Sequence, residues 1–291
     1  MIMLLFRWQE ALKAAFATLA TLLRVVLMSQ WRVVRPPRVG ERCVILGNGP
    51  SLSQSLHQYA PVLAHYRRVC VNDFPRSDAF EQIKPDIYLI AAKEYWRDDV
   101  LDSYKANSRA TFDALLRKTT WQMAVLLPYE SRGHRAFIAQ FAQNPNLQIY
   151  YFNMTPVEGF PAWCHRFFDR GWGTPRPHNV LIPCLMLAIG MGFREVYLLG
   201  ADHSWLPEIS VNERNEALVC QKHFYDESAA QASIMYRAGQ RPRRLYEILE
   251  KFYLTFRAYF DIKDYADRKG VAIYNATPQS FIDAFERQTL P

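Results

Sequence analysis

The chain has 291 residues, of which 50% are hydrophobic and 14% aromatic, which supports one large domain and excludes general disorder. The formal net charge of +7 suits anionic partners such as a phosphorylated substrate or acidic lipid headgroups. The five cysteines form no CxxC pair, which argues against a zinc knuckle and favours a cytoplasmic protein. Basic residues are dispersed without an RNP-like or helix-turn-helix pattern, so no nucleic-acid partner is expected.

Residues 1–38 are predicted to form an amphipathic basic helix that ends before Pro36-Pro37. Only ten uncharged residues separate Lys13 from Arg24, so the segment is expected to be too short to span a bilayer. The pattern favours a helix lying on the inner face of a membrane, which would make the protein cytoplasmic and peripheral to the inner membrane. The alternative is a helix docked on the protein's own core. Its predicted apolar side carries Leu4, Leu5, Trp8, Leu12, Leu19, Leu22, Leu23 and Val26, and its polar side carries Gln9, Glu10, Lys13, Thr21 and Arg24.

Residues 39–291 alternate short apolar runs with helical patterns. This alternation predicts an α/β fold: a mostly parallel, Rossmann-like sheet with helices on both faces. The stretch at about 206–244 has weak periodicity and many charges, and it is expected to be an irregular, lid-like insertion or a surface excursion without function. Strands are predicted at 43–46, 68–71, 87–90, 123–127, 148–152, 196–199 and 271–274, and helices at 53–65, 95–116, 132–143, 180–191 and 245–269.

The first predicted strand ends in a short polar turn that contains Gly47, Asn48, Gly49 and Ser51. In a doubly wound sheet, ligands bind beyond the carboxyl ends of the strands. The glycines are expected to let the backbone approach a ligand closely, and the Asn48 amide can donate and accept hydrogen bonds. Ser51 or Ser53 is expected to cap the next helix, whose free N–H groups favour a phosphate. The turn lacks both GxGxxG and GK[ST], so an ordinary strand–helix turn is the alternative.

Other polar side chains follow later strands or precede a helix. Asn72 and Asp73 follow the second strand and are predicted to contact a base, a ribose or a sugar, unless they only form a turn. His178 and Asn179 precede a strongly apolar helix, whose N-terminus again offers unpaired N–H groups.

The most polar strand end follows residues 196–199, where a glycine turn leads to Asp202 and His203. Within the insertion, Lys222, His223 and Tyr225 supply a cation, a base and a phenol. Histidine titrates near neutral pH, so His203 and His223 are the natural general-base candidates.

Four segments carry a family resemblance: "CVILGNGPSL", "CVNDF", "CLMLAIGMGFREVYLLGAD" and "VAIYNATPQSFI". In this order they resemble the landmarks of the bacterial sialyltransferases of glycosyltransferase family 42. The pattern is also similar to flagellin-modifying nonulosonate transferases and to an archaeal-type 6-hydroxymethylpterin diphosphokinase group. The resemblance covers residues 42–281 discontinuously and is specific for the superfamily, not for one substrate. It implies one α/β nucleotide-binding domain with a lid-like insertion, a CMP-activated donor and no metal or other cofactor.

The resemblance also implies roles for individual residues. Asn48, Gly49 and Ser51 would face the phosphate and ribose of the donor, Asn72 would contact the nucleotide or its sugar, and Asp202 would match the acid after the glycine turn.

Two features depart from the family. His178-Asn179 stands where the family has a Thr-Ser-Gly turn, and no histidine lies near Phe256, where the family has its general base. The base is therefore expected to be His223, with His203 as the second candidate.

Together these features predict a glycosyltransferase that moves an acidic sugar from a CMP-activated donor to a surface or lipid-linked glycan. The sugar would be sialic acid, a related nonulosonate or Kdo. A base takes the proton of the acceptor hydroxyl while CMP leaves, and Tyr225, Lys222 or Arg176 stabilises the departing phosphate.

Two alternatives stay open. One is a metal-dependent pyrophosphokinase-like enzyme in which Asp202, His203, His223 and Asp226 hold a divalent ion that bridges ATP phosphates. The other is a non-catalytic nucleotide-sugar-binding protein of a polysaccharide complex.

Overall fold

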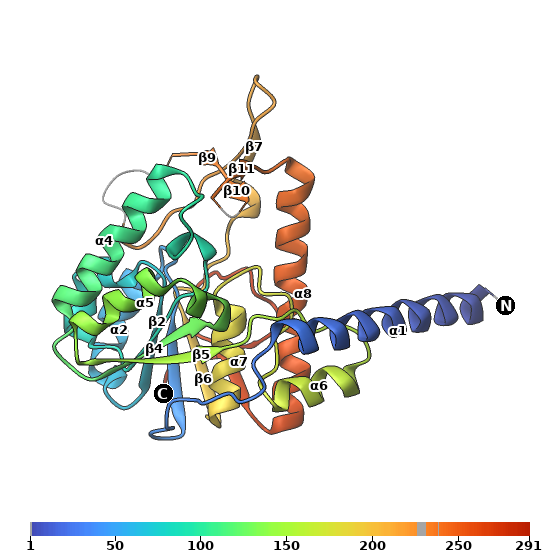
Figure 1. The fold of residues 1–291 in the computed structure, drawn as a ribbon, viewed down its shortest axis with the longest axis horizontal. Coiled ribbons are helices and arrows are strands. Elements are labelled where there is room, and N and C mark those ends of the chain that lie inside the picture. Colours follow the sequence, from blue (N-terminus) through green and yellow to red (C-terminus); the bar gives the residue numbers. More distant parts are fainter. Residues whose placement is uncertain (1, 226–230, 238) are drawn as a thin grey trace.

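One parallel sheet organises the chain (Figure 1). The structure, a computed structural model, describes residues 2–225, 231–237 and 239–291, with side chains from residue 7 onward. The sheet has eight strands in the order β13-β12-β6-β1-β2-β3-β4-β5, and every neighbouring pair is parallel. The predicted Rossmann-like α/β fold is confirmed. The strands are β1 (Arg42–Leu46), β2 (Arg67–Val71), β3 (Ile87–Leu89), β4 (Met123–Pro128), β5 (Leu147–Phe152), β6 (Glu195–Leu199), β12 (Ala272–Asn275) and β13 (Glu286–Arg287).

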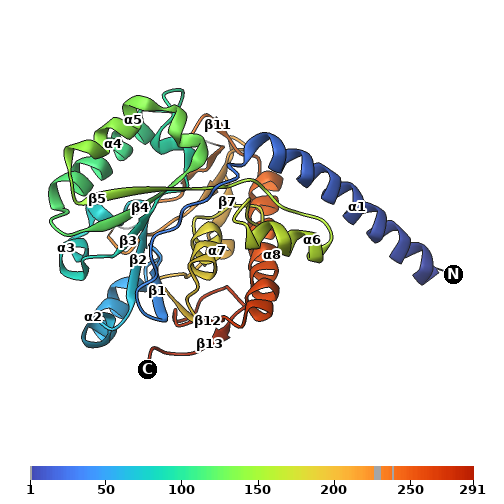
Figure 2. The same cartoon turned by 60° about the horizontal axis from the view of Figure 1, so that its bottom comes forward.

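Helices cover both faces of the sheet, as Figure 2 shows. Alternate residues of β1 point to opposite layers: Cys43 and Ile45 enter one buried cluster, and Val44 and Leu46 enter the other. Because both faces are buried, the strands are continuously apolar. One layer contains α6 (Pro161–Asp169), α7 (Leu181–Met191) and α8 (Leu245–Lys269), and the other contains α2 (Leu52–Leu63), α3 (Ala79–Ile83), α4 (Asp102–Lys118) and α5 (Arg135–Gln140).

The order of the strands reverses at β1. The chain adds β2 to β5 on one side of β1 and then returns to place β6 on the other side. A crevice opens at such a switch point, beyond the carboxyl ends of the two strands that flank it. The ends of β1 and β6 therefore mark where a ligand is expected.

Several predicted helix boundaries were wrong. The helix predicted at 95–116 begins at Asp102, because Lys93–Tyr95 forms a separate 3-10 turn, η2. The segment 132–143 is divided among η3 (Tyr129–Gly133), α5 and η4 (Phe141–Gln143). The nine-residue α6, the five-residue α3 and the two-residue β13 were missed, since they are too short to show a periodic pattern.

The insertion is more regular than predicted. After η5 (Leu206–Glu208) it forms a three-stranded antiparallel sheet and a two-stranded one. Ala217 and Val219 are buried against Ile248 and Phe252 of α8, which fixes the base of the insertion. Its strands have two or three residues each, too few for an alternating pattern: β7 (Ile209–Val211), β8 (Ala217–Val219), β9 (Ser233–Ile234), β10 (Tyr236–Arg237) and β11 (Arg241–Pro242).

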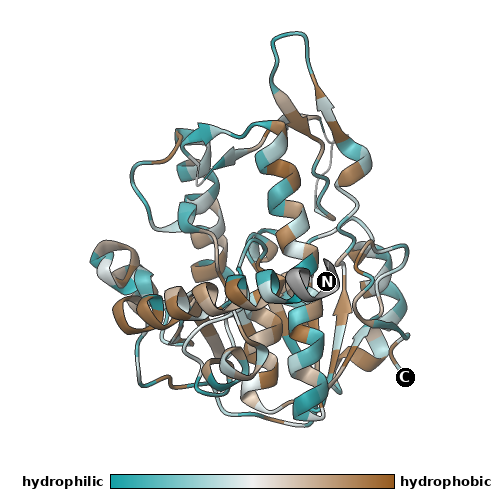
Figure 3. Ribbon diagram, turned by 90° about the vertical axis from the view of Figure 1, so that its right-hand side faces the viewer, coloured by the Kyte–Doolittle hydropathy of each residue, from teal (hydrophilic) through white to brown (hydrophobic). Residues whose placement is uncertain are grey.

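Helix α1 (Ile2–Met28) projects from the domain (Figures 1 and 2). Its polar residues Thr18 and Thr21 are buried against the domain, while apolar side chains face outward; Figure 3 shows the hydrophobic residues along it. Arg7–Met28 is long and apolar enough to cross a membrane, so the prediction that the segment is too short to span was wrong. The exposed apolar residues of α1 are Trp8, Leu12, Phe16, Leu19, Leu23, Val26, Leu27 and Met28.

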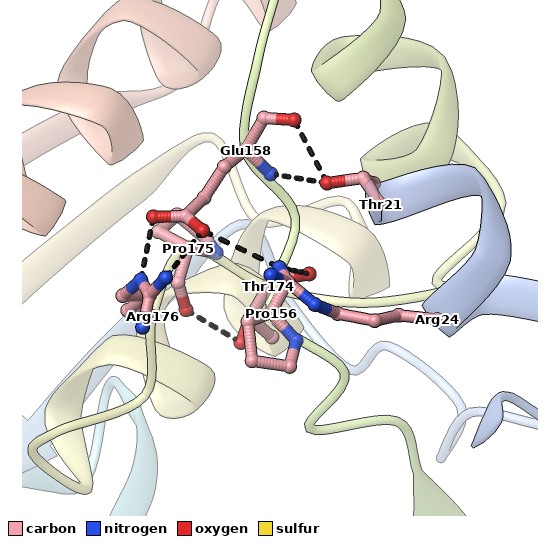
Figure 4. A network of polar contacts seen from close by, with 7 residues as sticks. All are labelled: Thr21, Arg24, Pro156, Glu158, Thr174, Pro175 and Arg176. Carbon is pink, nitrogen blue, oxygen red and sulfur yellow. Dashed lines mark hydrogen bonds and ion pairs between the residues drawn. The ribbon is translucent and has the colours of Figure 1, made fainter. Parts of the chain in front are cut away.

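A polar network holds the C-terminal end of α1 (Figure 4). The Thr21 hydroxyl donates to the Glu158 carbonyl at 2.8 Å and accepts from the Glu158 N–H at 2.9 Å. The Glu158 carboxylate pairs with Arg24 at 3.3 Å and with two nitrogens of Arg176 at 2.5 and 2.8 Å. Polar contacts of this kind explain why the threonines face the domain, beside Leu22 and Val25, which pack on its core.

Candidate functional site

A cavity of about 770 Å³ lies beyond the carboxyl ends of β1, β2 and β6, bordered by the insertion and α8. It is large enough for a nucleotide-sized ligand. Ser51 and Arg176 do not line it. The sequence-predicted residues that line it are Gly47, Asn48, Gly49, Asn72, Asp73, His178, Asn179, Asp202, His203, Lys222, His223 and Tyr225.

The glycines of the first turn have a packing role that the sequence did not predict. A Cβ at Gly47 would lie 2.4 Å from the Gly200 carbonyl oxygen, and a Cβ at Gly200 would lie 2.7 Å from the Gly47 oxygen. Gly49 donates its N–H to the same Gly200 oxygen at 2.8 Å. The small residues thus let two turns of neighbouring strands pack against each other. Gly47 and Gly49 also line the cavity, and contact of their backbone with a ligand stays a prediction.

The side chain of Asp202, from the turn after β6, lies against the N-terminus of α2. Its carboxylate accepts the Ser51 N–H at 3.2 Å and the Ser51 hydroxyl at 2.9 Å. Burial raises the pKa of Asp202, and the hydrogen bonds from Ser51 oppose that rise. Neither Ser51 nor Ser53 caps α2 with its side chain, because the Ser51 hydroxyl is bound to Asp202. The predicted phosphate position at this helix is therefore already held by an internal carboxylate.

Asn48 and Asn72 offer hydrogen-bonding capacity that the protein does not use. Asn48 donates its amide N–H to the Val71 carbonyl at 3.1 Å, which fixes the orientation of the amide. The side-chain oxygens of Asn48 and Asn72 are buried and have no hydrogen-bond partner among the described residues. Asn72 has a φ of 48°, a left-handed conformation that asparagine tolerates well. Because unpaired buried acceptors cost free energy, a ligand that donates to them gains affinity.

Asp73 lines the cavity, but its carboxylate is held by the protein. It accepts the Tyr95 hydroxyl at 2.5 Å, the Asn107 amide at 3.0 Å and the Thr111 hydroxyl at 2.6 Å. These bonds connect the end of β2 to η2 and α4. Asp73 therefore supports the wall next to Asn72.

His203 is a poor candidate for the base. Its Nε2 lies 2.6 Å from the Tyr259 hydroxyl, and its ring packs 4.1 Å from that of Trp205. Burial, helped by the nearby charge of Lys251, lowers the pKa of His203 to about 3. A base with so low a pKa accepts a proton weakly at neutral pH.

His223, Tyr225 and Lys222 lie together on the cavity wall formed by the insertion. The rings of His223 and Tyr225 stack with their centroids 5.2 Å apart and their planes 4° from parallel. The Phe224 N–H donates to the Asn48 carbonyl at 3.1 Å, so this segment is attached to the first turn. His223 is therefore placed beside the asparagine whose side-chain oxygen is unpaired.

Two more predicted residues stand at the start of α7. The Asn179 side-chain oxygen accepts the Leu181 N–H at 2.8 Å, so it satisfies one of the helix's free donors itself. The Nε2 atom of His178 is buried and has no hydrogen-bond partner in the part of the chain that the structure describes. Burial, with the nearby charges of Lys251, Arg176 and Arg243, lowers the pKa of His178 to about 4.

Arg176 was predicted to hold the donor, and its position argues against that role. It is paired with Glu158 in the network that docks α1, and it lines a separate cavity of about 90 Å³ near α6 and α8. Arg176 is therefore not part of the proposed site for the departing phosphate.

Among the lining residues that sequence reasoning missed are Glu94, Arg243 and Lys251, which carry charge into the large cavity. Lys251 lies in α8 and Arg243 just before it, far in sequence from any strand end. The only sequence signal for them is a basic run, Arg241–Arg244, which reads as an exposed face.

No cluster of three or more histidine, cysteine, aspartate or glutamate residues suited to a metal occurs in the part of the chain that the structure describes. Asp202 and His203, which were predicted as alternative ligands, are bound to Ser51 and Tyr259. Asp226 lies outside the described residues.

No protein-family model and no curated protein sequence matches the chain. Among solved structures, the chain is similar to a MAf glycosyltransferase from Magnetospirillum magneticum AMB-1, with a TM-score of 0.49 and 11% sequence identity. The alignment covers 90% of this chain and 35% of that one, so this chain spans about a third of its neighbour's length. An identity this low transfers neither activity nor site residues, and function is argued from the site itself.

Proposed function

We propose that the protein is a glycosyltransferase that uses a CMP-activated acidic sugar and an acceptor glycan, free or lipid-linked. The observation that carries the proposal is a pair of buried oxygens, those of Asn48 and Asn72, in one large cavity at the switch point of the sheet; no described residue donates a hydrogen bond to them. These oxygens accept hydrogen bonds from the amino group of a cytosine or the hydroxyls of a ribose. The quoted motifs resemble those of CMP-sugar-dependent enzymes, which fits the same ligand.

The proposed reaction is a single displacement. The acceptor oxygen bonds to the anomeric carbon while the bond between that carbon and the CMP phosphate oxygen breaks, and CMP leaves with the electron pair. His223 takes the proton of the acceptor hydroxyl. Lys222 and Tyr225, on the same wall of the cavity, stabilise the charge that develops on the phosphate. Helix α1 holds the protein at a membrane, where a lipid-linked acceptor is found.

A thermal-shift screen with CMP, CDP, UDP, GDP and ATP, each with and without magnesium, tests the proposal. A ligand that binds only the folded state raises the melting temperature in proportion to its affinity and concentration. We expect the largest rise with CMP, and no need for metal. A rise with ATP that requires magnesium would replace the proposal with the pyrophosphokinase-like alternative. Binding of CMP without any sugar transfer would favour the non-catalytic one.

A further inference from the structure

A set of nitrogen donors lines the cavity on the side of α8 and α7. Lys251 lies one turn and a half into α8, Arg243 just before that helix, and His178 before α7. The amine of Lys251 has one hydrogen-bond partner among the described residues, the Met235 sulfur at 4.0 Å. A thioether is a weak acceptor, so the ammonium group is poorly satisfied.

The other two donors are also incompletely satisfied. The Arg243 Nε atom and the His178 Nε2 atom are buried and have no hydrogen-bond partners in the described chain. Lys251, His178 and His203 line the same cavity, and the charge of Lys251 contributes to the lowered pKa of both histidines.

The acidic residues nearby do not neutralise this set. Glu247 is bound to Arg241, at 2.7 Å, and to Arg237, at 3.5 Å. Glu94 also lines the cavity and acts on Lys251 and Arg243 at longer range. Burial, helped by the charge of Arg243 and opposed by that of Glu94, lowers the pKa of Lys251 to about 8. Buried cations without an ion-pair partner cost free energy, which a bound anion recovers.

We propose that Lys251, Arg243 and His178 form an anion-binding subsite for a carboxylate or phosphate group of the ligand. The subsite lies in the same cavity as Asn48 and Asn72. It replaces the start of α2, which Asp202 occupies, as the place where the ligand's negative charge is held. The inference deepens the proposed function, on which it rests for the identity of the nucleotide.

The test follows the Lys251 amine by NMR in protein labelled with ¹³C at the lysine ε-carbons, with its signal assigned by its loss in Lys251→Met. The probes are inorganic phosphate, pyruvate, cytidine, CMP and a CMP-linked acidic sugar. We expect an anionic probe to raise the pKa of Lys251. We also expect Lys251→Met to weaken binding of that probe about tenfold, the usual effect of losing a charged hydrogen bond. The matched control is Lys263→Met, a paired, exposed lysine of the same helix, which should bind like the wild type.

The probes and variants distinguish the possible outcomes. If Lys251→Met weakens CMP but not cytidine, the subsite holds phosphate; if it weakens only the CMP-linked acidic sugar, the subsite holds the carboxylate. If CMP binds equally to wild type and Lys251→Met, and no anion changes the Lys251 pKa, the subsite is refuted while the proposed function stands. If no cytidine compound binds but phosphate or pyruvate still raises the Lys251 pKa, the proposed function fails and the subsite stands.

Discussion

At the scale of single residues, the carboxylate of Asp202 determines where in the cavity a ligand's negative charge can bind. It lies against the start of α2 and binds both polar hydrogens of Ser51. A second anion beside it would be repelled, so ligand phosphate or carboxylate is expected elsewhere in the cavity. The amide side chains of Asn48 and Asn72 and the nitrogen donors near α8 remain for the ligand. Asp202 therefore acts as an internal support, and His203 beside it as a neutral packing residue.

Replacing Asp202 tests this structural role. Asp202→Ala leaves the N–H and hydroxyl of Ser51 without their acceptor, and we expect it to lower the free energy of unfolding by about 1–3 kcal/mol. Asp202→Asn keeps an oxygen acceptor and removes a charge whose burial is unfavourable, so its loss should be smaller. Urea denaturation of both variants provides the comparison. Equal stability of Asp202→Ala and the wild type would show that these bonds are unimportant.

His203 gives a prediction about pH. Its pKa of about 3 in the folded protein lies below its value of about 6.5 in an unfolded chain. The unfolded chain therefore binds more protons as the pH falls. The stability that neutral His203 contributes is complete above pH 6.5 and is lost as the pH falls toward 3, by up to about 1.4 kcal/mol per pH unit. His203→Asn should flatten the decline in unfolding free energy between pH 6.5 and 4.5. An unchanged slope would contradict the buried, neutral assignment.

At the scale of elements, the glycine turns after β1 and β6 hold the two central strands together. The backbone of Gly200 has a φ of +64°, and an added methyl group would collide with Gly47 and Leu52. Because both turns border the cavity, their packing also sets the position of Asn48. The turns are thus the link between the fold and the site.

Gly200→Ala should therefore be costly. Backbone strain and the clash together are expected to lower the free energy of unfolding by more than about 1 kcal/mol. Gly133→Ala is the matched control, since a methyl group there meets nothing within 4 Å; its effect should stay within about 0.5 kcal/mol. Denaturant unfolding of the two variants measures the difference. If Gly200→Ala is as stable as Gly133→Ala, the proposed packing of the turns is wrong.

The long, periodic elements were predictable from the sequence, and the cavity wall next to α8 was not. Seven of the eight strands of the central sheet were found to within one or two residues, and α8 was found at its observed bounds, because buried strands and amphipathic helices have clear patterns. Twelve of the fourteen predicted site residues line one cavity, since strand ends converge at the switch point. Lys251 and Arg243 could not be found this way, because helix packing alone brings them to the cavity. Nor could pattern show that Asp202 would occupy the helix start.

At the scale of the whole molecule, the exposed apolar face of α1 is a second candidate binding surface, separate from the cavity. Thr21 and Thr18 of α1 bind the domain at Glu158 and Phe160, so most apolar residues of this 27-residue helix face outward. Exposed apolar area of this kind indicates a membrane or a partner protein. With a segment long enough to span a bilayer, we expect the membrane.

Vesicle flotation tests this expectation. The wild-type protein should float with vesicles of neutral and anionic phospholipids. A variant with Leu12, Phe16, Leu19 and Leu23 replaced by glutamine should not, since each buried side chain contributes about 1.5–3 kcal/mol. Thr18 and Thr21 stay in place, so docking to the domain is kept. Equal flotation of the variant would show that α1 does not provide the membrane contact.

The most direct test of the central claim is the affinity for CMP, measured by calorimetry on the wild type and Asn72→Gly. Glycine keeps the left-handed backbone of residue 72 and removes the side-chain amide, including its oxygen. Lys84→Gly is the control, because Lys84 is exposed, has the same φ of 48° and lies outside the cavity. We predict that CMP binds the wild type and Lys84→Gly equally and Asn72→Gly about tenfold more weakly. Failure of the wild type to bind CMP, or equal binding by all three proteins, would contradict the claim that this cavity recognises a cytidine nucleotide.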